Sequence, residues 1–191
     1  MIRVDVVPAA SVDELLDMLA DCDGRFDSLG PDGDPIDILA HSLQCAAVLR
    51  AVAPDDVELQ VAGLVHDLGH AVTPGEAAAH GTTGAAYVRP LLGARVARLT
   101  ELHVPAKRYL VAVDAVYASV LSDGSTRSLA VQGGAVSDAE RAELERDPHL
   151  PDALRLRRAD EAAKVIGKVV PGVDTWRAAV TQVAASASSI T

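Results

Sequence analysis

Apolar residues recur at intervals of three and four along most of this sequence, the spacing that places them on one face of an α-helix. Alternating patterns of strand length are absent apart from MIRVDVV at the start, which is too short to define a strand. The pattern therefore predicts an all-α fold. Helices are expected within residues 11–22 and over 36–53, 57–68, 81–92, 94–101, 105–121, 138–146, 152–166 and 174–186.

Polar residues mark several helix ends. Ser11 with Glu14, and Ser137 with Glu140, have the spacing of a capping box. The stretch DGRFDSLGPDGDP after the first helix is rich in Gly, Pro and Asp, which predicts a loop.

The composition favours one compact domain over residues 1–191. The chain is 49% hydrophobic with a mean hydropathy of +0.19. With five aromatic residues, its core has to be built from Ala, Val and Leu. We expect a helical bundle over about 36–166, an N-terminal helix and substrate-side loop in 1–35, and a frayed tail at 186–191.

Charge and cysteine content narrow the function classes. A net charge of −10 argues against nucleic-acid binding, which depends on Lys and Arg, but allows a small anionic ligand. Cys22 and Cys45 have no zinc-type spacing and are expected to be reduced packing residues. No secretory signal or bilayer-length apolar run is present, so we expect a cytoplasmic protein without membrane contact. The sequence leaves the oligomeric state open.

The segment VAGLVHDLGH, residues 61–70, places His66, Asp67 and His70 against an apolar run. A buried carboxylate is costly unless a positive group meets it. No Lys or Arg occurs in these ten residues or in the next ten, so either a distant basic side chain or a bound cation must supply that charge.

Six residues in the predicted helices and at their ends form a candidate metal-ligand set. Each alone has an ordinary explanation, such as a hydrogen-bonded core histidine or a solvated carboxylate. Together, four imidazoles and two carboxylates suit one or two ions of iron, manganese or zinc. Asp67 has two oxygens and could bridge ions about 3.5 to 4 Å apart. The set is His41, His66, Asp67, His80, His103 and Asp160.

A histidine, a later His-Asp doublet, further histidines and a distant aspartate together resemble the HD-domain superfamily. That family is a compact helical bundle, and most members are metal-dependent phosphohydrolases. HVPAKRYL, SLAVQGG and LRLRRADEAAKV more closely resemble its mixed-valent diiron branch. That branch includes 2-amino-1-hydroxyethylphosphonate dioxygenase and is distantly related to myo-inositol oxygenase. The resemblance covers roughly residues 38–166.

This resemblance implies two iron ions, Fe(II) and Fe(III), with O2 as co-substrate. The implied reaction cleaves the C–P bond of a 1-hydroxyalkylphosphonate, with or without an amino substituent, to phosphate and a carboxylic acid. The first iron would be held by His41, His66, Asp67 and Asp160, and the second by Asp67, His80 and His103.

Substrate contacts are expected beside the irons. Lys107 lies one helical turn beyond His103, and Arg157 lies three residues before Asp160. Alone, the RLRR segment would be an ordinary solvated basic stripe, but beside a metal Arg157 becomes a candidate phosphonate clamp. The resemblance also places His70, Ser125 and Gln132 near the substrate. His70 and Lys107 are the candidate catalytic residues.

The family's tyrosine and glutamate before the first ligand histidine are not matched. Counting back from His41 gives Pro31 and Asp34 at those positions. Proline cannot bind iron, and Asp34 reaches one methylene less far toward a substrate ammonium. Realignment would put Asp32 or Asp37 there instead, so a different amine, or none, is compatible with this loop.

Three alternatives remain at the level of sequence. An HD-domain phosphohydrolase acting on a phosphate ester or nucleotide would use the same His-Asp core. A zinc protease would use His66 and His70, but its motif needs a glutamate where this chain has Asp67. A non-catalytic binding module would be expected to lack some of the six ligands.

Overall fold

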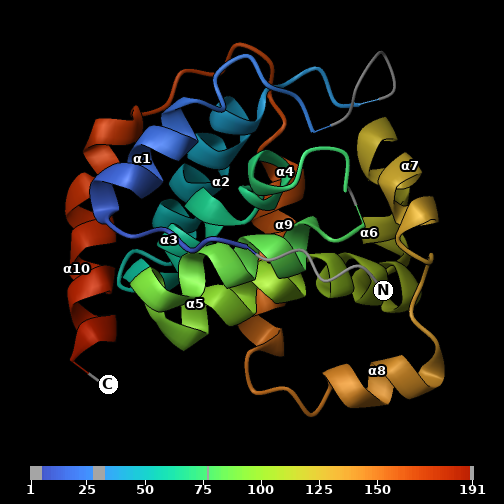
Figure 1. The fold of residues 1–191 in the computed structure, drawn as a ribbon. Coiled ribbons are helices and arrows are strands. Elements are labelled where there is room, and N and C mark those ends of the chain that lie inside the picture. Colours follow the sequence, from blue (N-terminus) through green and yellow to red (C-terminus); the bar gives the residue numbers. More distant parts are fainter. Residues whose placement is uncertain (1–5, 28–32, 77, 190–191) are drawn as a thin grey trace.

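The computed structural model describes residues 6–27, 33–76 and 78–189, and every regular element in these ranges is a helix (Figure 1). The predicted all-α fold is confirmed. The elements are α1 Val12–Ala20, α2 Ile38–Val52, α3 Val57–Val65, α4 Gly69–Val72, α5 His80–Val113, α6 Ala115–Ser119, α7 Asp123–Val131, α8 Asp138–Leu144, α9 Leu150–Ala162, the 3-10 helix η1 Val173–Trp176 and α10 Arg177–Ser188.

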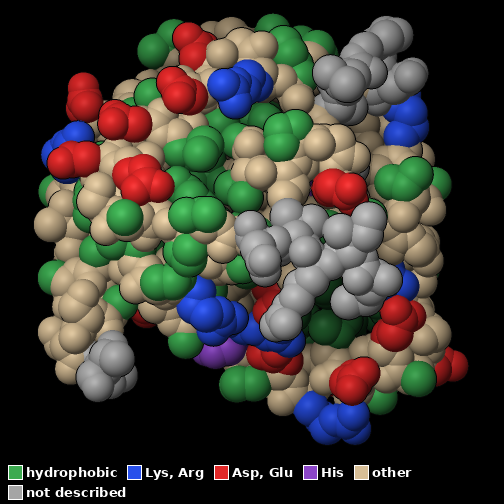
Figure 2. Space-filling view, in the orientation of Figure 1, with side chains coloured by type: hydrophobic (Ala, Val, Ile, Leu, Met, Phe, Trp, Pro, Cys, Tyr) green, Lys and Arg blue, Asp and Glu red, His purple; other side chains and the backbone are tan. Residues whose placement is uncertain are grey.

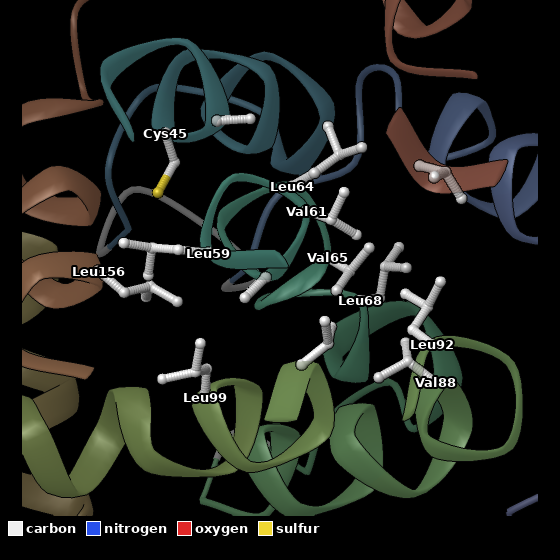
Figure 3. Close-up of a cluster of buried hydrophobic side chains, with 14 of the residues drawn as sticks. Cys45, Leu59, Val61, Leu64, Val65, Leu68, Val88, Leu92, Leu99 and Leu156 are labelled. Carbon is white, nitrogen blue, oxygen red and sulfur yellow. The ribbon is translucent and has the colours of Figure 1, made fainter. Parts of the chain in front are cut away.

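Helix α3 occupies the centre of the bundle, in contact with α2, α5, α9 and α10. Its sequence, VELQVAGLV, is apolar nearly all round, and every residue from Leu59 to Val65 is buried. Such a helix needs neighbours on all sides. Figure 3 shows Val61, Leu64 and Val65 among side chains of the surrounding helices. The polar residues that follow α3 are therefore carried into the interior.

Helix α5 differs most from the sequence prediction. The three helices expected over 81–92, 94–101 and 105–121 are one run through Val113, interrupted at Gly93, where φ is +82°. Pro105 removes one backbone hydrogen bond without ending the helix, because tertiary packing of this segment replaces the lost local stability. Asp114 then starts α6 by accepting hydrogen bonds from the N–H groups of Val116 and Tyr117.

Two short helices were missed because they lack an apolar stripe. Helix α7, DGSTRSLAV, is mostly polar and is capped by Ser122, whose hydroxyl accepts from the N–H of Ser125. Helix α4 has four residues and begins at Gly69. Both helices lie beside the candidate functional site. The spacing of apolar residues therefore predicted secondary structure least well around that site.

The caps are partly as predicted. Ser137 and Glu140 form a complete capping box at α8. At α1, Ser11 accepts from the N–H of Glu14, but the Glu14 carboxylate accepts from Ala10 rather than from Ser11. MIRVDVV begins outside the described residues, and its last two, Val6 and Val7, adopt no regular structure.

The surface agrees with an acidic protein. Exposed acidic side chains of α1 gather on the face shown in Figure 2, while α10 and α7 lie at opposite sides of the bundle (Figure 1).

No helix in the described part of the chain is long and apolar enough to cross a membrane. Cys22 and Cys45 are buried free thiols, as expected.

Gly69 allows the turn after the His-Asp doublet to touch the start of α5. A β-carbon at Gly69 would overlap the His80 carbonyl oxygen and lie 2.6 Å from its carbonyl carbon. We expect Gly69→Ala to lower the free energy of unfolding by about 1–3 kcal/mol, because backbone must move. Gly172→Ala is the matched control, since φ there is −70° and nothing lies within 4 Å. Urea denaturation of both variants checks this expectation; equal stabilities would contradict it.

Candidate metal centre

The six predicted ligand residues converge on one place in the bundle. His41 comes from α2, His66 and Asp67 follow α3, and Asp160 comes from α9. Both remaining histidines belong to α5, one at its first residue and one in its second half. The side chain of Asp67 is 14% exposed, and the other five residues are buried. Helices distant in sequence thus bring the set together.

One group of side chains surrounds the Oδ2 atom of Asp67. The Nε2 atoms of His41 and His66 lie 3.2 Å apart, and Asp67 Oδ2 lies 3.5 and 3.4 Å from them. Asp160 completes the group, with Oδ1 3.3 Å from His41 Nε2 and Oδ2 3.8 Å from His66 Nε2. These atoms converge as the ligands of a single cation would.

A second group surrounds the other oxygen of Asp67. The Oδ1 atom lies 3.6 Å from His80 Nε2 and 3.5 Å from His103 Nε2, and these two nitrogens are 2.8 Å apart. The carboxylate of Asp67 therefore directs one oxygen at each group. This arrangement suits a carboxylate that bridges two cations.

Backbone carbonyls orient three of the imidazole rings. The Nδ1 atoms of His41, His66 and His103 face the carbonyl oxygens of Ala163, Gly63 and Thr100 at 3.1, 2.8 and 2.5 Å. A ring that donates from Nδ1 keeps a lone pair on Nε2. Each Nε2 atom then points into the cluster in the form that ligates a metal.

The charge states also suit a metal. Burial tends to raise the pKa of Asp67, but the neighbouring histidines hold it well below its usual range. Burial likewise opposes ionisation of Asp160, and Arg157 and His41 outweigh it, lowering its pKa. Burial and the nearby His66 lower the pKa of His103 to about 4, so its ring is neutral. The two carboxylates and His103 thus have the protonation states a metal requires. Burial tends to lower the pKa of His41, but Asp160 and Asp67 outweigh it and raise that pKa, so metal binding would displace a proton from this ring.

His70 lies at the edge of the second group. Its ring stacks on His80 with centroids 4.0 Å apart, and one nitrogen lies within 4.8 Å of ligand atoms of Asp67 and His80. This position is compatible with the predicted substrate contact and equally with ligation.

A cavity of about 230 Å³ opens beside the cluster. Lys107 lines it, is 4% exposed and donates to Ser128 Oγ at 2.7 Å. Burial, aided by Arg157, lowers the pKa of Lys107 to about 7. All residues predicted to contact the substrate line this cavity: Asp34, His70, Lys107, Ser125, Gln132 and Arg157.

Residues 38–163, which carry the whole cluster, match the HD domain family. The chain belongs to the HD-domain family. Hydroxymethylphosphonate dioxygenase of Gimesia maris is 41% identical over 147 residues, 72% of this chain and 73% of that protein. The 1-hydroxy-2-(trimethylamino)ethylphosphonate dioxygenase (glycine-betaine-forming) of Leisingera caerulea is 32% identical over 164 residues, 80% and 82% of the two chains.

These relatives place the chain in the phosphonate dioxygenase branch of the HD-domain family and identify it as a metal-dependent oxygenase. They favour the oxygenase over the phosphohydrolase, zinc-protease and binding-module interpretations of the sequence.

Arg157 of this HD-domain oxygenase is held by several partners. One terminal nitrogen contacts Asp160 and the other contacts Glu161 and donates to Ser125 Oγ at 2.9 Å. Its Nε–H donates to the Tyr117 hydroxyl at 2.5 Å. Most of its N–H groups are therefore engaged within the protein, and the guanidinium fixes a predicted metal ligand as well as lining the cavity.

Asp34 is also engaged. Lys164 Nζ lies 2.6 Å from Asp34 Oδ2, and the Ser122 hydroxyl donates to the same oxygen at 3.0 Å. Asp37, the alternative after realignment, caps α2 by accepting from the N–H of Ala40. Pro31 and Asp32 lie outside the described residues.

Three residues of this network were not among the site residues predicted from the sequence: Tyr117, Glu161 and Lys164. Glu161 follows Arg157 by four residues on one face of α9, and Lys164 lies just beyond the end of that helix at Ala162. That spacing was available in the sequence. The position of Tyr117, on another helix, had no local signal.

Metal removal is expected to destabilise this oxygenase. Chelation leaves two buried carboxylates and four imidazoles without their cations, and ligand binding to the folded state contributes about 2.7 kcal/mol when free metal is 100 times the Kd. Anaerobic addition of Fe(II) to chelated protein should therefore raise the Tm, with Mg²⁺ as a weaker control because it prefers oxygen ligands. Elemental analysis and thermal melts check this; an unchanged Tm at full iron loading would contradict it.

Proposed function

We propose that this protein uses O2 to cleave the C–P bond of a 1-hydroxyalkylphosphonate, at a centre of two iron ions in the Fe(II)/Fe(III) state. The observation that carries the proposal is Asp67, whose two oxygens face two separate groups of imidazole nitrogens. The dioxygenase names of its relatives support the reaction type.

The ligand residues divide between two ions. His41, His66 and Asp160 would hold one, His80 and His103 the other, and Asp67 both. A bound iron pair supplies the electron exchange with O2 that cleavage of this bond needs. The protein contributes fixed ligand positions through the backbone carbonyls behind the rings.

The cavity residues would bind and orient the phosphonate. Lys107 and Arg157 offer positive charge to its oxygens, and Ser125 lies between Arg157 and Lys164. The amide oxygen of Gln132 is buried and has no hydrogen-bond partner among the described residues, so it is available to accept from a substrate hydroxyl. His70, at the cavity edge, is positioned to move a proton.

The reaction balances with one O2 per substrate. RCH(OH)PO3H2 and O2 give RCOOH and H3PO4, so the carbon and the phosphorus each gain one oxygen and the C–P bond is lost. Its test is phosphate release from hydroxymethylphosphonate by iron-loaded protein, in air and under nitrogen, with O2 uptake measured. Equal consumption of O2 and release of phosphate is expected. Release that persists under nitrogen would indicate a phosphohydrolase and overturn the proposal.

Lys107 should give kcat/KM a pH dependence. Its pKa of about 7 in the free enzyme means that raising the pH through 7 removes the positive charge that binds the phosphonate. We expect kcat/KM to fall above about pH 7 and the fall to be weaker in Lys107→Arg, since arginine stays charged. The substrate ionises in the same way with either enzyme. A difference between their pH profiles of kcat/KM therefore reports the ionisation of Lys107. Identical profiles would contradict this role.

A further inference from the structure

We propose that the substrate's carbon substituent is uncharged, hydrogen or a short alkyl group, and that Lys164 sets this preference by neutralising Asp34. The proposal rests on the proposed function. It concerns Asp34, which stands at the position where the family's glutamate contacts a substrate ammonium.

Asp34 already has a cation inside the cavity wall. Its Oδ2 atom is 2.6 Å from Lys164 Nζ and accepts from the Ser122 hydroxyl at 3.0 Å, and its Oδ1 accepts from the Gly124 N–H at 3.3 Å. The side chains of Asp34 and Lys164 are only 12% and 15% exposed. A substrate ammonium would meet a carboxylate whose charge is already offset.

Lys164 is as fully engaged as Asp34. Besides Asp34, its ammonium donates to Ser122 Oγ at 2.9 Å and to Ser125 Oγ at 2.6 Å. A lysine has three N–H donors, and these three acceptors use them all. To release Asp34 for a substrate, Lys164 would have to break its 2.6 Å contact with that carboxylate. Glu161 lies 3.7 Å from the same ammonium, but it is already paired with Arg157.

The aspartate is also fixed by packing. A β-carbon at Gly124 would lie 2.7 Å from Asp34 Cγ, so the carboxyl group rests directly on the first turn of α7. Because Gly124 leaves room only for a hydrogen there, Asp34 cannot swing back toward α7 to admit an ammonium group. The ion pair therefore forms part of the cavity wall.

Across the whole cavity lining, the Asp34–Lys164 pair included, basic side chains outnumber acidic ones apart from the metal ligands. Outside the ligand cluster the lining includes two acidic side chains, Asp27 and Asp34, against four basic ones. Asp27 has a buried Oδ1 without a hydrogen-bond partner among the described residues, but it is one carboxylate facing a basic majority. The basic residues are Lys107, Arg127, Arg157 and Lys164.

Apolar side chains complete the lining. Ile36, Ile38, Val104 and Val131 border the same cavity. An ammonium placed against them would lose water without gaining a partner, whereas hydrogen or a methyl group would not. The cavity thus combines cations for a phosphonate with apolar surface for its carbon substituent.

The test compares kcat/KM for hydroxymethylphosphonate and 1-hydroxyethylphosphonate with that for 2-amino-1-hydroxyethylphosphonate. We expect the unaltered enzyme to favour the uncharged substrates by about tenfold or more, since like charges are rejected at close range. Lys164→Gln keeps hydrogen-bonding capacity but leaves the Asp34 charge without its cation. The kcat/KM ratio of uncharged to amino-substituted substrates should therefore fall by about tenfold. Lys168→Gln, at an exposed position four residues on, is the matched control and should leave it unchanged.

A second pair of variants keeps the test decisive if Lys164→Gln folds poorly. Asp34→Asn should strengthen discrimination against the amine, and Asp34→Asn with Lys164→Gln should return it toward the original value, because both charges are gone. Preference of the unaltered enzyme for the amine, or an unchanged ratio in folded Lys164→Gln, overturns the proposal. Absence of phosphate release from every phosphonate in air overturns the proposed function instead, and this proposal with it.

Discussion

Asp67→Asn is expected to abolish turnover and to reduce bound iron below two ions per chain. The Asp67 carboxylate directs Oδ2 at His41 and His66 and Oδ1 at the second pair of histidines. An amide has one acceptor oxygen and no charge, so it cannot hold both ions. A catalytic metal supplies several kcal/mol, and each 1.36 kcal/mol is tenfold in rate, so kcat should fall by roughly 10³ or more.

Phosphate release measures the expected loss of turnover, and elemental analysis measures the expected loss of iron. Asp23→Asn is the matched control, because it makes the same chemical change at an exposed loop position beyond α1. The control should keep full activity and iron. An Asp67→Asn enzyme with two irons and near-normal kcat would refute the bridging role.

Arg157→Met is expected to have the largest effect on folding. Arg157 and Asp160 are both 4% exposed or less, and the guanidinium also meets Glu161, Ser125 and Tyr117. Removing it leaves the Asp160 and Glu161 carboxylates without the guanidinium that pairs with both. Breaking a buried ion pair from one side typically costs about 3–5 kcal/mol, so the free energy of unfolding should fall by that amount. Activity should fall too, because a metal ligand loses its support.

The adjacent residue supplies the control. Arg158 is half-exposed, pairs with Asp114 at 2.7 Å and lies over the ring of Tyr117. Surface pairs contribute about 0–1 kcal/mol, so Arg158→Met should be nearly neutral. Arg157→Lys should restore little, because one ammonium cannot reproduce the forked contacts. Chemical denaturation distinguishes the variants, and equal losses at the two positions would argue against a special role for Arg157.

The spacing of apolar residues predicted most helices. It failed for helices that depend on tertiary packing or on a capping residue. Helices α2 and α9 were expected close to their observed places. Helix α5 runs through Pro105 because packing offsets the lost hydrogen bond, and α7 forms without an apolar stripe because Ser122 caps it. The packing around Pro105 is not visible in a window of sequence, whereas the Ser122 cap is a local signal that the periodicity prediction did not use.

The sequence by itself determined the fold class and the six residues that meet at the candidate metal centre. A buried carboxylate requires a compensating positive charge, and four imidazoles with two carboxylates beside apolar helical runs made these residues a candidate metal-ligand set. Their order along the chain supplied the resemblance to the HD-domain family, which the comparisons confirm.

Only the tertiary structure decided which groups face one another. The division of Asp67 between two sets of histidines depends on how α2, α5 and α9 pack around α3. The pairing of Lys164 with Asp34 likewise joins the end of α9 to a loop before α2. Helical spacing determines which side chains are neighbours within one or two turns of the same helix. Ion pairs between helices depend on how the helices pack, which a local sequence pattern does not specify.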